Sequence, residues 1–180
     1  DSPSSQGLAM TIALVGCLAG AMLCGTLADR IGRKRLLLVS ALIFFVSSWA
    51  TGLADTFGAF LVARFLGGVG IGVASGLSPM YIAEVAPAAI RGRLVSFNQL
   101  TIVLGILAAQ ITNWLIADTI PATATAQDIA VSWNGQMAWR WMFWAAMVPS
   151  VIFCLTVLLI PESPRWLAMK GRSDTARKIW

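Results

Sequence analysis

The sequence is poor in the residues that most catalytic and metal sites use. Its 180 residues include no histidine and only three cysteines. A histidine-bearing metal site or catalytic triad is therefore excluded within them. Cys17, Cys24 and Cys154 lie in apolar runs and lack the paired spacing of metal ligands, so we expect free thiols buried in lipid. We predict no metal site and no cofactor.

Charge is also scarce. Charged residues make up 12% of the chain against 58% hydrophobic residues, and they are bunched between long uncharged runs. A water-soluble domain would scatter its charges at helical spacing. The composition therefore excludes an ordinary soluble domain.

Five apolar runs are long enough to cross a bilayer, which takes about 20 residues of helix. Backbone groups in lipid must be satisfied within their own segment, and the runs do not alternate polar with apolar residues as barrel strands would. We therefore predict an all-α integral membrane protein. Its five transmembrane helices are expected at about 7–28, 36–54, 58–83, 94–117 and 140–160.

The basic residues indicate how these helices are oriented. Lys and Arg cluster at 30–35, 91–93 and 165–178, whereas the connections 55–58 and 118–139 hold acidic residues and neither Lys nor Arg. Basic loops stay in the cytoplasm during insertion, so the first three segments are predicted inside and the other two outside. The net charge of +5 thus reflects topology and not nucleic-acid binding. An outer aromatic belt is expected from Trp133, Trp139, Trp141 and Trp144.

The same topology places Asp1 outside, with no signal peptide before it. At least one upstream helix is therefore expected. The other end of the sequence is a basic, helix-like stretch at 163–180. We expect the sequence to be a fragment of a longer chain.

Arg64 is the one charge inside the third apolar run. An isolated charge there costs about 2.5–3.5 kcal/mol on insertion scales, so the side chain should face protein or water and pair with an acidic residue. No acidic residue of this sequence lies at a similar depth, which leaves a partner from elsewhere in the protein. The alternative is that Arg64 reaches the outer headgroups.

The fourth apolar run carries a polar stripe. Gln99, Gln110 and Asn113 fall near one face at about 100° per residue. Unsatisfied amides are costly in lipid, so this face should turn toward the bundle interior. It can line a solute path or form hydrogen bonds between helices.

Small residues recur every four positions in two of the runs, a spacing that lets helices pack closely. We give these glycines a structural role and no substrate contact. They are Gly16 and Gly20 in the first run and Gly68, Gly72 and Gly76 in the third.

Three motifs together resemble the sugar porter family of the major facilitator superfamily. GTLADRIGRK at 25–34 is similar to the superfamily signature between the second and third helices. RFLGGVGIG at 64–72, continuing through SPMYIAE at 78–84 to Arg91-Gly92, resembles the fourth-helix motif of sugar porters. PESPRWL at 161–167 resembles the motif after their sixth helix. The resemblance covers essentially the whole chain.

This resemblance implies that the five helices are the second to sixth of a twelve-helix transporter. Residues 1–160 would then belong to its N-terminal bundle, and residues 161–180 would begin its intracellular helical domain. Arg64 matches an arginine that lies near a first-helix aspartate in proton-coupled members. A cytoplasmic charge network between the two halves is also implied, formed by Asp29, Arg33, Glu84, Arg91, Glu162 and Arg165.

The resemblance also implies a substrate site on the fourth apolar run. Gln99 matches the glutamine that hydrogen-bonds the sugar, and an amide suits hydroxyl groups because it both donates and accepts. Ile102 and Ile106 would supply apolar lining, with helix packing as their alternative role. Gln110 and Asn113 would line the outer path.

Three functions remain open. The first is monosaccharide transport by alternating access, as proton symport or facilitated diffusion. The second is a transporter-like sugar sensor, and the third is transport of a polyol or another non-sugar solute. An enzyme is not expected, because the spans hold no paired carboxylates and no nucleophile with a base. The expected partners are a sugar, protons as coupling ion, the lipid bilayer of a plasma or inner membrane, and the remainder of the same transporter chain.

Overall fold

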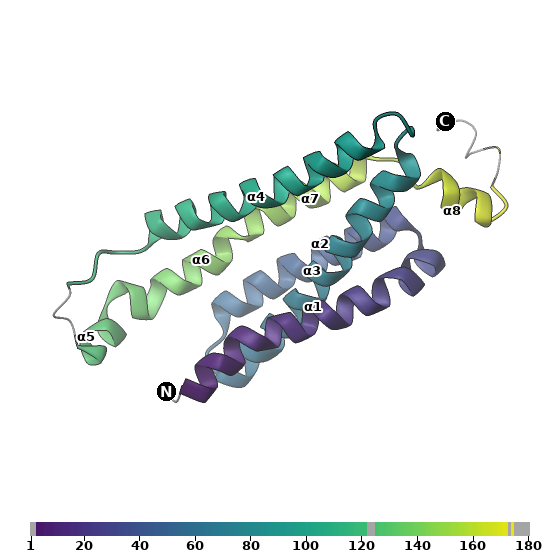
Figure 1. Ribbon diagram of the computed structural model, residues 1–180. Coiled ribbons are helices and arrows are strands. Elements are labelled where there is room, and N and C mark those ends of the chain that lie inside the picture. Colours follow the sequence, from purple (N-terminus) through teal and green to yellow (C-terminus); the bar gives the residue numbers. More distant parts are fainter. Residues whose placement is uncertain (1–2, 122–124, 173, 175–180) are drawn as a thin grey trace.

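In the computed structural model, which describes residues 3–121, 125–172 and 174, every regular element of those residues is a helix (Figure 1). The predicted all-α fold with five apolar helices is confirmed. The segments long and apolar enough to span a membrane are Gly7–Ile31, Arg33–Leu53, Phe57–Val85, Arg91–Ile116 and Asn134–Leu159. In chain order the elements are α1 (Pro3–Ile31), α2 (Arg33–Leu53), α3 (Phe57–Val85), α4 (Arg91–Ile116), α5 (Ala126–Val131), η1 (Asn134–Ala138), α6 (Trp139–Ala145), α7 (Met147–Leu159) and α8 (Pro164–Met169).

Successive long helices run in opposite directions, so their connections alternate between two ends of the molecule (Figure 1). One end, called the basic end below, carries the α1–α2 junction, the α3–α4 loop and α8. The opposite end, called the tryptophan-rich end, carries the start of α1, the α2–α3 turn, α5 and η1. Arg140 is a basic residue at the tryptophan-rich end, one position beyond the connection 118–139, which holds neither Lys nor Arg. Its Nη2 lies 3.1 Å from Asp55 Oδ1. Which side of a membrane each end faces stays a prediction.

Glycines bring α1 and α3 into close contact, as the spacing predicts. A Cβ added to Gly68 would overlap the carbonyl oxygen of Ala13, and one added to Gly72 would overlap that of Cys17. The contact is reciprocal, since a Cβ on Gly16 or Gly20 would overlap a carbonyl oxygen of α3. The two backbones can approach this closely only because no side chain stands between them.

The break between α1 and α2 depends on Gly32, whose φ of 102° lies in a region that other residues rarely adopt. After this residue α2 begins at Arg33, three residues before the predicted start at 36. Of the basic residues that the sequence assigned to a loop, Arg33, Lys34 and Arg35 therefore form the first turn of α2, whereas Arg30 lies in the last turn of α1. This placement turns Arg33 into the bundle, where it is 3% exposed.

The last span is interrupted, whereas the sequence predicts one helix over 140–160. It begins as the π-helix η1, continues as α6 and breaks at Ala146 before α7. Pro149 has no N–H to donate to the carbonyl four residues earlier, which weakens the helix at this point. At Ala146 the N–H bonds the backbone oxygen of Phe143, three residues earlier, at 3.2 Å, so the turn is tighter than an α-helical turn. Both α6 and α7 pack against α2.

Candidate functional site

A buried ion pair holds the basic end together. Arg33 donates from Nε to Glu84 Oε2 and from Nη2 to Glu84 Oε1, both at 2.9 Å. Its Nη2 also lies 3.0 Å from Asp29 Oδ1, and its Nη1 donates to the Ala28 oxygen at 3.1 Å. The guanidinium thus uses its donors in the fork geometry that suits a carboxylate. This pair links α2 to α3, with Asp29 adding the end of α1.

A second carboxylate closes the same end from the other side. Glu162 Oε1 accepts from the backbone N–H of Lys34 at 2.9 Å and from that of Ser163 at 3.0 Å. It lies at the start of α2, where unpaired N–H groups and the helix dipole favour an anion. A Cβ on Gly32 would lie 2.7 Å from Glu162 Oε2, so the glycine is needed for this approach as well as for its φ.

Ser163 joins the two carboxylates. Its hydroxyl donates to Glu84 Oε2 at 2.6 Å and accepts from the Trp166 N–H at 3.4 Å, which caps α8. Ser163 is fully buried. Trp166 Nε1 also donates to the backbone oxygen of Asp29 at 3.1 Å, and the Tyr81 hydroxyl donates to the backbone oxygen of Pro161 at 2.9 Å. Helix α8 is therefore fastened to the ends of α1 and α3.

The remaining two members of the predicted network stand apart from this cluster. Arg91 donates from Nη2 to the Ala86 oxygen at 3.3 Å, a contact within its own loop. Arg165 is exposed on α8. Neither forms an ion pair within the described part of the chain. Four of the six predicted residues are thus brought together, and two are not.

Arg64 lines a cavity of about 490 Å³ between the helices at the tryptophan-rich half of the bundle. Its Cζ lies 5.1 Å from the centroid of the Phe143 ring, and its Nε is buried without a hydrogen-bond partner. No acidic side chain within residues 3–121, 125–172 and 174 forms an ion pair with it. The guanidinium therefore turns to the bundle interior rather than outward to the headgroup region. The other polar residues of the lining are Ser47, Ser48, Thr51 and Asn113.

The predicted substrate residues share one face of α4, since they are spaced three or four positions apart. Asn113 is half-buried and lines the Arg64 cavity. The other four are exposed, and their face lies open within the described chain: Gln99, Ile102, Ile106 and Gln110. From Asn113 to Gln99 this face runs about 21 Å along the helix toward the basic end.

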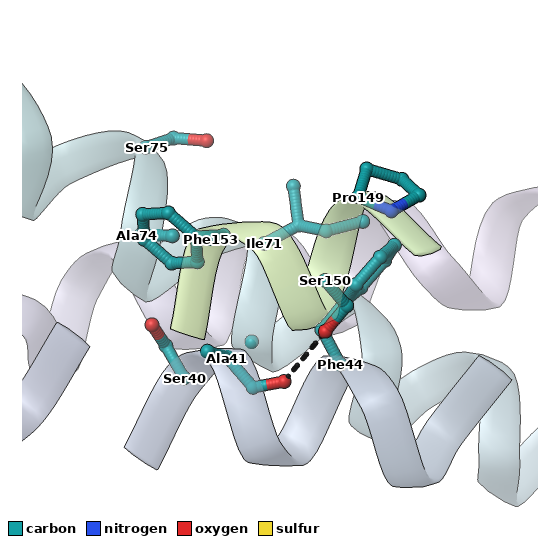
Figure 2. A pocket seen from close by; sticks show the side chains of 10 residues that line it. Ser40, Ala41, Phe44, Ile71, Ala74, Ser75, Pro149, Ser150 and Phe153 are labelled. Atoms are coloured by element: carbon teal, nitrogen blue, oxygen red, sulfur yellow. Dashed lines mark hydrogen bonds between the residues drawn. The ribbon is translucent and has the colours of Figure 1, made fainter. Parts of the chain in front are cut away.

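A second, smaller cavity of about 230 Å³ lies between α2, α3 and α7 (Figure 2). It is lined mainly by apolar and small residues, including Phe44, Gly70 and Phe153. Figure 2 shows the hydrogen bond from Ser150 Oγ to the Ala41 oxygen, which measures 2.9 Å. The hydroxyls of Ser40 and Ser150 bond helix carbonyl oxygens, so these two groups support helix packing.

The chain matches the model of the family described as "Sugar (and other) transporter" over residues 1–180. It belongs to this sugar transporter family. The resemblance carried by the three motifs is thereby confirmed, and with it membership in a class of multi-pass membrane proteins.

Named relatives of this sugar transporter chain agree with the assignment. It is 44% identical over 174 residues to the glucose transport protein of Synechocystis, covering 96% of this chain and 36% of the relative. It is 41% identical over 178 residues to the arabinose-proton symporter of Bacillus subtilis, covering 99% of this chain and 36% of the relative. The D-xylose-proton symporter of Escherichia coli is 37% identical over 194 residues, covering 98% and 38%. The chain thus spans just over a third of the length of these relatives.

Solved structures show the same fold. The proton:xylose symporter XylE bound to 6-bromo-6-deoxy-D-glucose superposes with a TM-score of 0.87 at 37% identity, over 98% of this chain and 39% of XylE. The inward-open conformation of XylE from E. coli gives a TM-score of 0.82 over 98% of this chain and 42% of the XylE chain. The sugar transporter chain therefore has the fold of one part of a major facilitator superfamily protein.

Some contact residues of this sugar transporter chain were missed as site residues although they lie in the quoted motifs. Ser163 precedes Pro164, and a serine before a helix-starting proline is a signal for an N-cap. Nothing in the sequence predicts that the Tyr81 hydroxyl and the Trp166 indole N–H bond distant backbone oxygens. Phe143 lies outside every motif and was found only by its position over Arg64.

Proposed function

We propose that the chain is part of a longer transporter that moves a monosaccharide across a plasma or inner membrane by alternating access. It supplies the second to sixth helices of the N-terminal bundle, and residues from 161 onward begin the intracellular helical domain. Family membership and the names of the relatives support the substrate class. The assignment is to transport and not to enzymatic catalysis.

The observation that carries this proposal is the polar face of α4, whose Asn113 end lines the Arg64 cavity. A sugar needs side chains that both donate and accept hydrogen bonds, together with apolar surface for its ring faces. Gln99, Gln110 and Asn113 supply the first, and Ile102 and Ile106 supply the second. The sugar binds along this face, with Gln99 as its main hydrogen-bonding partner.

The basic-end cluster acts as the contact that alternates between states. Its charged residues, together with Arg91 and Arg165, form the conformational charge network. Each contact only needs to bias two nearly balanced conformations, because a modest difference in free energy shifts a two-state population many-fold. The exposed Arg91 and Arg165 complete the network with residues of the remaining chain.

Arg64 is the candidate for proton coupling. Two of the relatives named above are proton symporters, which favours symport over facilitated diffusion. A carboxylate from the remaining chain pairs with Arg64 when ionised and leaves it when protonated, so proton binding changes the charge balance of the cavity.

Counterflow uptake by the complete transporter in proteoliposomes tests the substrate site. With a panel of labelled sugars, we expect saturable exchange that Gln99→Ala reduces about 5- to 150-fold, since an unpaired sugar hydroxyl costs ~1–3 kcal/mol. Thr101→Ala is the matched control, because the Thr101 hydroxyl already bonds the Phe97 oxygen of its own helix. Equal loss in both variants would remove Gln99 from the site.

An imposed pH gradient then separates symport from facilitated diffusion. Accumulation that follows the gradient and is lost in Arg64→Met supports coupling at Arg64. Exchange of no sugar at all by folded protein would favour a sugar sensor or a transporter of a polyol or other solute.

A further inference from the structure

Three aromatic rings form a cluster between α3 and α6 at the edge of the Arg64 cavity. The ring centroids of Phe60 and Trp139 lie 6.1 Å apart, those of Phe60 and Phe143 5.9 Å, and those of Trp139 and Phe143 6.4 Å. All three pairs are edge-to-face, with interplanar angles of 69°, 76° and 78°. Edge-to-face packing is the arrangement that aromatic quadrupoles favour. The cluster therefore fixes the orientation of the Phe143 ring from two sides.

Two arginines sit over rings of this cluster from opposite ends. Arg140 Cζ lies 5.0 Å from the Trp139 centroid, and Arg64 Cζ lies 5.1 Å from the Phe143 centroid. Both distances fall within cation–π range. Arg140 also pairs with Asp55. Arg64 has neither an ion pair nor a hydrogen bond in the described residues, so the face of Phe143 is the electrostatic partner that they provide.

Among the described residues that line the cavity, none carries a negative charge that could balance that of Arg64. The cavity lining described above includes no Asp, Glu, Lys, Tyr or Cys, and Arg64 is its single titratable side chain. Asp55, the acidic residue at this end, pairs with Arg140 and forms no ion pair with Arg64 in the described residues. A phenyl ring neither titrates nor dissociates, so its attraction for the guanidinium persists in every protonation state of the protein.

We propose that Phe143 is the positioning residue for Arg64: its ring face holds the guanidinium in the cavity beside Asn113 at every stage of transport. This rests on the proposed coupling role of Arg64. A carboxylate partner binds Arg64 only while ionised, and the arginine would otherwise reorient each time that partner is protonated. The ring keeps the guanidinium in place between these encounters, ready to receive the carboxylate again.

Stepwise fluorination of residue 143 tests the contact, because fluorine weakens the negative face of the ring with little change in shape. The mono-, di- and trifluoro phenylalanines are introduced into the complete transporter, and the melting temperature in detergent is measured. We expect a stepwise decrease that disappears in the Arg64→Met background, as a double-mutant cycle requires. The same series at Phe60 is the matched control, since Phe60 belongs to the cluster but no cation of the described residues lies over its ring.

The decrease in melting temperature per fluorine could be the same with Arg64 and with Arg64→Met, or the same at positions 60 and 143. Either result would mean that Phe143 only packs, and would overturn the proposal. Uptake tests the role in transport. Gradient-driven accumulation should fall with each fluorine, to about a tenth for the trifluoro ring, while counterflow exchange stays within about twofold.

Accumulation that is unchanged across the series, in protein whose stability cycle shows the contact, would also refute the positioning role. Unchanged accumulation in Arg64→Met would refute the coupling role of Arg64 itself. The stability cycle would still decide in that case whether Phe143 holds the guanidinium, so the two failures are distinguishable.

Discussion

Glu84→Gln removes one charge from the basic-end cluster and preserves the shape of the side chain. The side chains of Arg33 and Glu84 are 4% and 5% exposed, and breaking a buried ion pair costs about 3–5 kcal/mol. Arg33 keeps Asp29 and the Ala28 oxygen as partners, which offsets part of this cost. We therefore expect the closed basic end to lose about 3 kcal/mol, a ~150-fold shift toward open forms.

Hydrogen exchange of the complete transporter measures this shift directly. The N–H groups of Trp166 and Leu167 bond to Ser163 within α8, a six-residue helix that is too short to persist in water once it detaches from α3. Their exchange should accelerate by about 100-fold in Glu84→Gln, since exchange reports the free energy of local opening. Asp55→Asn is the control, because its exposed ion pair at the other end is worth about 0–1 kcal/mol. Unchanged protection of α8 in folded Glu84→Gln protein would refute the view that this pair holds the basic end closed.

Two glycine substitutions test the packing that presents the site, both measured as melting temperatures in detergent. Gly72→Ala should lower stability by about 1–3 kcal/mol, because the new Cβ overlaps the Cys17 oxygen and forces α1 and α3 apart. Gly32→Ala should cost about 1–3 kcal/mol, through its φ of 102° and the approach of Glu162. Gly105→Ala has open space around it and should be neutral or stabilising by up to about 1 kcal/mol. A neutral or stabilising effect at all three positions would show that backbone entropy, and not close contact, decides the outcome.

Helix existence was predictable because it depends on local composition, whereas helix ends were not. Gly32 ends α1 and lets α2 begin at Arg33, a start that depends on the Glu162 contact from the far end of the chain. The break at Ala146 was missed, although Pro149 offered a signal for it. A proline in a long apolar run can be tolerated by a continuous helix, and its effect depends on what packs beside it.

The members of the charge cluster could be named from motifs, but their pairing could not. Arg33 bonds Glu84, 51 positions away, and Ser163 reaches the same carboxylate across 79 positions. Arg91 and Arg165 belong to the same motifs and lie apart from the cluster. Which charges meet depends on the relative positions of α2, α3 and α8, and motif membership does not contain that information.

Local hydropathy, the distribution of basic residues and short motifs were enough to predict the apolar helices, their alternation and the family. Which surfaces face one another depended on the fold. In the fold, Arg64 lies over the Phe143 ring, and Asn113 lines the same cavity as Arg64. The other predicted substrate residues of α4 are exposed. Such contacts arise from the packing of helices distant in the chain, where close glycine contacts, a proline break and buried ion pairs jointly set the geometry.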